Sequence, residues 1–87
     1  MICHEGLLEL KKHDEENQTQ YMETLRVYLE QHLSATQAAR ELFIHRSTFL
    51  YRLDRIREIL QSELDDPEEI FYLELSFRLL EQEREKE

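Results

Sequence analysis

Residues that break or turn the backbone are almost missing from this sequence, which has one glycine, Gly6, and one proline, Pro67, among 87 residues. Sheets and turn-rich folds need more of both, because glycine and proline supply the backbone angles of tight turns. Most of the remaining residues are good helix formers such as Leu, Glu, Arg, Gln and Ala. We therefore expect an all-α fold of about five helices, forming a single domain over residues 1–87.

Apolar spacing and capping residues predict the first two helices. A short helix is expected over residues 4–13, followed by a polar connector over residues 14–18. The second helix should begin near Asn17 or Thr19, since either side chain can cap it, and should end around residues 31–32. Its apolar residues recur at intervals of three and four, which predicts one buried face: Tyr21, Met22, Leu25, Tyr28 and Leu29.

Two helices joined by a short turn are predicted next, over residues 34–60. Ser34 and Gln37 match a capping box, which starts a helix that ends at Leu42. Its small inward residues Ala35, Ala38 and Ala39, with Leu42, let another helix approach closely. After the turn at 43–45, a helix over 46–60 presents a narrow apolar stripe to the core: Phe49, Leu53, Ile56 and Leu60.

The last helix, at about residues 67–84, has a clear start. Asp66 can cap it, Pro67 suits its first position, and two glutamates follow at the positive end of the helix dipole. It carries two apolar stripes, one of Ile70, Leu73, Phe77 and Leu80 and one of Phe71, Leu75 and Leu79. One stripe suffices for the core of the domain, so we expect the other to contact a second subunit or domain.

The charge is strongly acidic but unevenly distributed. The net charge is −9, which at first argues against DNA, because neutralising phosphates dominates most protein–DNA affinity. Residues 34–60, however, hold five basic and three acidic side chains, and they form the only positive third of the chain. The positive charge therefore coincides with the predicted pair of helices.

An α-helix fits the major groove of B-DNA, and a shorter helix packed behind it can set its angle. On helix 46–60 the face opposite the apolar stripe is polar, and cations lie along its flanks. The predicted DNA-binding residues are Arg46, Ser47 and Tyr51 towards the bases, and Thr48, Arg52 and Arg55 towards the phosphates. Asp54 and Glu58 share the outer face and would repel phosphate, so we expect only the first half of the helix to enter the groove.

Two interpretations of this pattern stay open. Arginines on an amphipathic helix commonly form a solvated face, so the chain could instead be an acidic helical dimerisation or adaptor module that binds protein. The acidic last third and the doubly apolar last helix favour that alternative, whereas the localised positive charge favours DNA.

The strings ARELFIHRSTFLYRLDRI at residues 39–56 and LDDPE at residues 64–68 resemble the carboxy-terminal helix-turn-helix domain of PucR/CdaR-type bacterial transcriptional regulators. The string TLRVYLE at residues 24–30 is similar to another segment of that family, and the resemblance covers about residues 7–80. More distantly, the central helices are similar to the DNA-binding end of the Fis protein, so the expected fold is Fis-like. The sequence departs from the family at Ser47, which is commonly asparagine, and at Gln61-Ser62, where a glycine is frequent.

The resemblance implies sequence-specific binding to double-stranded operator DNA, usually as a homodimer. It also implies an upstream sensory domain, which this sequence lacks, in a bacterial transcriptional regulator. Transferred by position, the family's reading helix contributes Arg46, Thr48, Tyr51 and Arg52.

Other classes of function lack support in the sequence. His45 has no second histidine, cysteine or carboxylate at metal-like spacing, so we expect a turn or cap role for it and no metal site. No glycine-rich phosphate loop or nucleophile motif is present, and we expect neither an enzyme nor a cofactor. No apolar run approaches a membrane span, and the single Cys3 fits a reducing cytoplasm, which is the expected location.

Overall fold

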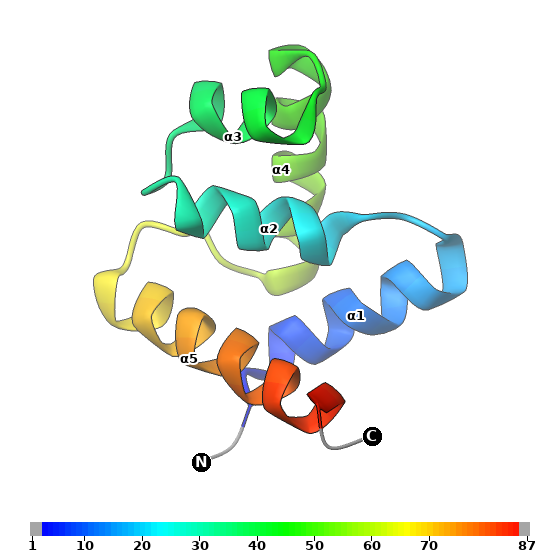
Figure 1. The fold of residues 1–87 in the computed structure, drawn as a ribbon, viewed down its shortest axis with the longest axis vertical. Coiled ribbons are helices and arrows are strands. Elements are labelled where there is room, and N and C mark those ends of the chain that lie inside the picture. Colours follow the sequence, from blue (N-terminus) through cyan, green and yellow to red (C-terminus); the bar gives the residue numbers. More distant parts are fainter. Residues whose placement is uncertain (1–2, 86–87) are drawn as a thin grey trace.

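A computed structural model describes the backbone of residues 3–85 and the side chains of residues 3–83. This part of the chain forms five helices and no strand, which confirms the expected all-α fold. The helices are α1 (Glu5–Asn17), α2 (Tyr21–Glu30), α3 (Ala35–Leu42), α4 (Arg46–Leu60) and α5 (Pro67–Glu85). Figure 1 shows α3 and the start of α4 at one end of the molecule and α5 at the other, with α2 between them. None of the described helices combines the length and apolar composition that crossing a membrane requires.

A continuous hydrophobic core joins the helices, and α2 packs against each of the other four. The predicted stripe of α4 is buried in full: Phe49 and Ile56 are 0% exposed, Leu53 2% and Leu60 5%. The Phe49 ring lies against the Tyr28 ring of α2, with 5.5 Å between their centroids. This burial leaves the opposite face of α4 to solvent.

The connection between α1 and α2 differs from the expectation. α1 continues to Asn17, so most of the predicted polar connector is helical. Neither Asn17 nor Thr19 caps α2. Instead, the Asp14 carboxylate in α1 accepts hydrogen bonds from the backbone N–H groups of Tyr21 at 2.9 Å and Met22 at 2.8 Å. A carboxylate from the preceding helix thus satisfies two of the free N–H donors at the start of α2.

The helices around the turn have the predicted bounds, because their ends are determined locally. Ser34 Oγ accepts a hydrogen bond from Gln37 N at 3.2 Å, as expected of a cap. α4 ends with Gln61 in the left-handed conformation, where Gln61 N donates to Glu58 O and Ser62 N to Arg57 O. These two bonds satisfy the last carbonyls of the helix. Gln61 therefore ends α4 in a conformation that glycine usually adopts at a helix end.

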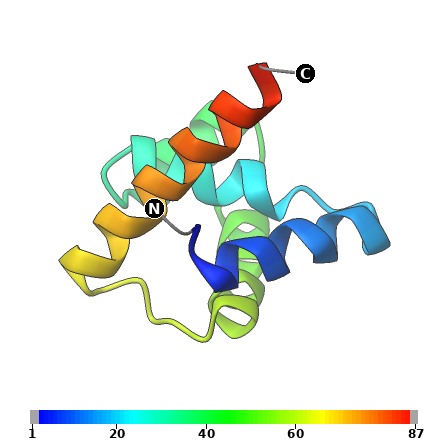
Figure 2. The same ribbon diagram turned by 90° about the horizontal axis from the view of Figure 1, so that it is seen from below.

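α5 begins as predicted, since Asp66 Oδ1 accepts from Glu68 N at 3.1 Å. The beginning of α1 lies beside the middle of α5 (Figure 2), where His4 N donates to the buried Ser76 Oγ at 2.9 Å. Of the two predicted stripes, the first supplies the buried Leu73 and Phe77. The second leaves Phe71 60% exposed, with Leu75 and Leu79 half-buried.

Candidate nucleic-acid interface

The first half of α4 presents a row of exposed polar side chains at the end of the molecule. Burial of Phe49 and Leu53 fixes the rotation of the helix, so the polar side chains on its far side point outwards. Four of the six predicted DNA-binding residues are exposed there: Arg46, Ser47, Thr48 and Tyr51. Tyr51 is 63% exposed, which confirms that it points away from the core.

Arg46 and the start of α4 carry positive charge that the domain leaves uncompensated. Arg46 has no hydrogen-bond or ion-pair partner within residues 3–83. His45 precedes the helix, but its side chain makes no capping hydrogen bond, so no side chain at this position shields the first-turn N–H groups. Free N–H groups and the helix dipole make such a terminus attractive to anions.

Arg52 is engaged within the domain. Its side chain is half-buried, and Nη1 donates to Thr24 Oγ1 on α2 at 3.2 Å. Thr24 is fully buried, and its hydroxyl donates in turn to Gln20 O at 2.7 Å. This chain of hydrogen bonds links α4 to α2, so Arg52 also positions the helix that was predicted to read DNA.

The arginines in the second half of α4 are paired with carboxylates. Arg55 Nη1 donates to Glu58 Oε2 at 2.7 Å. A side-chain hydrogen bond with Tyr21 and the charge of Glu58 raise the pKa of Arg55. Arg57 Nη1 lies 3.7 Å from Asp54 Oδ1. The positive charge that is available to DNA is therefore concentrated at the start of α4, as the positions of Asp54 and Glu58 suggested.

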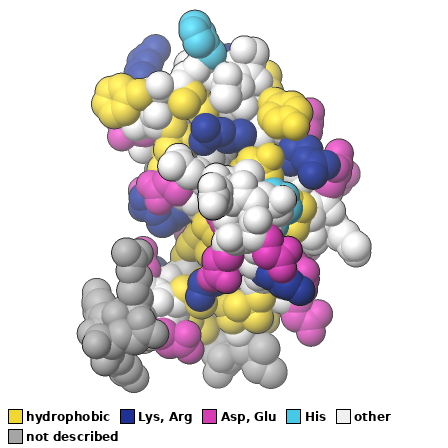
Figure 3. All heavy atoms as spheres, turned by 90° about the vertical axis from the view of Figure 1, so that its right-hand side faces the viewer, with side chains coloured by type: hydrophobic (Ala, Val, Ile, Leu, Met, Phe, Trp, Pro, Cys, Tyr) yellow, Lys and Arg dark blue, Asp and Glu magenta, His cyan; other side chains and the backbone are white. Residues whose placement is uncertain are grey.

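One exposed aromatic residue in this region was absent from the predicted site. Phe43, in the turn between α3 and α4, is 95% exposed. Figure 3 views the molecule from the right-hand side of Figure 1, so α3 and the start of α4 lie in its upper part. Hydrophobic, basic and histidine side chains lie close together there. The sequence feature that could have revealed this residue is a phenylalanine inside the predicted turn, at a position that belongs neither to the apolar stripe of α3 nor to that of α4.

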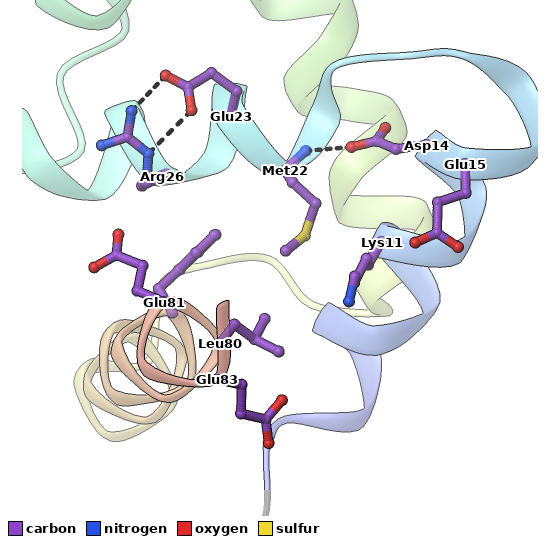
Figure 4. A pocket seen from close by; sticks show the side chains of 10 residues that line it. Lys11, Asp14, Glu15, Met22, Glu23, Arg26, Leu80, Glu81 and Glu83 are labelled. Carbon is purple, nitrogen blue, oxygen red and sulfur yellow. Dashed lines mark hydrogen bonds and ion pairs between the residues drawn. The ribbon is translucent and has the colours of Figure 1, made fainter. Parts of the chain in front are cut away.

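A groove of about 510 Å³ lies at the opposite end, between α1, α2 and α5. The apolar part of its lining consists of Met22, Phe77 and Leu80. The rest of the lining is charged, with five acidic and two basic side chains (Figure 4): Asp14, Glu15, Glu23, Glu81, Glu83, Lys11 and Arg26. Arg26 is paired with Glu23 and Glu30, and hydrogen bonding to Glu23 raises its pKa. This excess of negative charge repels phosphate.

A short helix, a tight turn and a longer helix with an exposed polar first half define a helix-turn-helix domain of the kind found in DNA-binding regulators. The family model for the PucR C-terminal helix-turn-helix domain matches residues 21–79. The chain belongs to this family, which confirms the resemblance.

Two curated relatives from Bacillus subtilis (strain 168) are regulators. The chain is 38% identical over 73 residues to the Purine catabolism regulatory protein, an alignment that covers 84% of this chain and 14% of the relative. It is 40% identical over 57 residues to the Proline-responsive transcriptional activator PutR, covering 66% of this chain and 14% of the relative. The matched region is thus a small part of each relative. The comparison with solved structures gave no significant match.

Proposed function

We propose that the chain binds double-stranded DNA sequence-specifically, as the operator-binding part of a bacterial transcriptional regulator in the cytoplasm. The observation that carries this proposal is the exposed row Arg46, Ser47, Thr48 and Tyr51, with Arg46 unpaired among the described residues. These side chains occupy the first half of a helix whose other face is buried. The first half of α4 enters the major groove, and Asp54 and Glu58 on the outer face keep the second half out of the groove.

The six predicted residues divide into two roles under this proposal. Arg46, Ser47 and Tyr51 face the bases, and Thr48 meets a phosphate. Arg52 and Arg55 approach phosphates from the flank of α4, and Arg52 also holds the helix against α2 through its hydrogen bond to Thr24. We propose no catalytic step for the chain. An upstream sensory region would control its binding to DNA.

Binding as a homodimer is part of the proposal, through the second apolar stripe of α5. A dimer reads two half-sites, which compensates for the few contacts that one half-helix can make. Phe71 is 60% exposed, and Leu75 and Leu79 follow it on one side of the helix. An exposed apolar stripe of this kind is typical of a helix that packs against a partner.

Replacing Leu75 and Leu79 together by glutamate is expected to give a monomer by light scattering, because each subunit would have to bury two carboxylates in the interface. Circular dichroism checks that the helices remain, and the more exposed Phe71→Glu serves as a second variant. Leu8→Glu is the matched control, since Leu8 is a 44% exposed leucine on α1. A dimer that persists in both α5 variants would contradict this interface.

A second candidate function is binding to another protein through the acidic groove. Its apolar lining of Met22, Phe77 and Leu80, with a net negative rim, complements a basic amphipathic segment of a partner. The groove is lined by residues of α1, α2 and α5. Figure 1 shows α5 at the opposite end of the molecule from the start of α4, so an occupant of the groove would leave the reading helix accessible. This candidate corresponds to the acidic adaptor module.

A titration of the wild-type chain with mixed genomic DNA, followed by gel shift at several salt concentrations, distinguishes the two functions. Binding through phosphate contacts falls steeply as salt rises, because each neutralised phosphate releases condensed counterions. We expect detectable binding at low salt that is lost at high salt. A complete lack of binding at low salt would contradict the proposed function and favour the protein partner.

A further inference from the structure

Phe43 combines full exposure with an unfavourable backbone conformation. It is 95% exposed and has φ 58° and ψ 41°, in the left-handed region. Phe43 N donates to Arg40 O at 3.2 Å and Ile44 N to Ala39 O at 3.1 Å. These two bonds end α3 in an arrangement in which the left-handed residue is usually glycine, because a Cβ atom is disfavoured there.

Packing within the domain does not explain a phenylalanine at this position. Leu64 is also left-handed, but its side chain is 4% exposed and belongs to the core, so burial offsets the backbone cost. The ring of Phe43 gains no comparable burial in the free chain. Leu33 is the third left-handed apolar residue and is 37% exposed, so Phe43 at 95% is by far the most exposed of the three. A bulky residue that is strained and almost fully exposed points to a function outside the fold.

The position of Phe43 suggests what the ring contacts. It lies in the turn three residues before Arg46, so DNA that receives the start of α4 would also meet this turn. A phenylalanine ring offers only apolar contact. In the major groove the corresponding group is the 5-methyl of thymine, and the edge of the groove offers the carbon atoms of deoxyribose.

We propose that Phe43 makes an apolar contact with DNA beside the start of α4, adding to the polar contacts of that helix. The inference rests on the proposed function, because it requires α4 to enter the groove. In a chain as acidic as this one, the apolar contact of Phe43 would add affinity for DNA that does not depend on counterion release. The apolar carbon surface of DNA is the ligand, and thymine methyl and deoxyribose are its two possible sources.

The test compares wild type with Phe43→Gly on a duplex that the wild-type chain has selected from a random-sequence library. Removing the ring should weaken binding roughly tenfold, in line with the loss of one apolar side-chain contact. The slope of affinity against salt should not change, since no charge is lost. The melting temperature should not fall, because glycine suits the left-handed position.

Gln61→Gly is the matched control, because it places glycine at the same kind of helix end, beyond the far end of α4. It should leave affinity unchanged. Equal affinity of Phe43→Gly and wild type would overturn the inference, whereas failure of the wild type to select any duplex would overturn the proposed function itself.

Replacing each thymine of the selected duplex by deoxyuridine then identifies the source of the contact. If one replacement weakens wild type but not Phe43→Gly, the ring contacts that methyl group. If Phe43→Gly binds more weakly but every replacement affects both proteins equally, the ring contacts deoxyribose.

Discussion

Phe49→Ala is expected to lower the free energy of unfolding by about 3–5 kcal/mol, the usual loss for truncating a buried phenylalanine. Phe49 is 0% exposed and stacks at a tilt against Tyr28, with 49° between the ring planes. Its removal would leave a cavity where α4 meets α2. Small domains are stable by about 5–15 kcal/mol, so the variant would lose a large share of its stability.

Urea unfolding followed by circular dichroism measures this loss. Phe43→Ala is the matched control, because it makes the same change at a phenylalanine that is 95% exposed. The control should unfold at a urea concentration close to that of wild type. A loss below about 1 kcal/mol for Phe49→Ala would mean that the core can close around the missing ring and does not depend on it.

Arg46→Ala is expected to weaken binding to a selected operator by about 1–3 kcal/mol for each Arg46 side chain that contacts a base, the cost of losing a good contact to a base edge. Affinity for random DNA should fall less, because only base contacts distinguish sequences. Fluorescence anisotropy with both duplexes measures the two affinities. The free energy of unfolding should not change, since Arg46 has no partner among the described side chains.

Two other arginines of α4 serve as comparisons. Arg57→Ala removes the same charge near the end of the helix, where Arg57 Nε donates to Glu63 O at 3.3 Å, and should preserve discrimination between the duplexes. Arg52→Ala is expected to weaken DNA binding and also to destabilise the domain, because it removes the bond to Thr24. If Arg46→Ala discriminates as well as wild type, Arg46 does not contact a base.

Features that depend on residues a few positions apart could be predicted from the sequence. The capping hydrogen bonds at Ser34 and Asp66 join residues three or two positions apart, and they determine where α3 and α5 begin. The apolar stripe of α4 repeats at helical spacing, so its burial and the exposure of Tyr51 followed from periodicity. The positive charge near the start of α4 followed from the sequence in the same way.

Contacts between helices could not be predicted in this way. Asp14 caps a helix that begins seven residues later, because the path of the connector brings its carboxylate to that helix end. Arg52 appeared free for phosphate on a helical wheel, yet Thr24, 28 residues earlier in the chain, accepts its hydrogen bond. A side chain's partner on another helix depends on how the helices pack, which one-dimensional spacing does not specify.

The sequence by itself thus determined the class of fold, the bounds of the central helices and the location of the candidate DNA-binding surface. The tertiary structure decided which cations of that surface remain available: Arg46 is unpaired among the described residues, while Arg52 and Arg55 are held by neighbouring side chains. It also exposed Phe43, because the hydrogen bonds that end α3 turn the backbone so that the ring points to solvent. Local patterns set each helix, whereas only packing sets what each exposed side chain can reach.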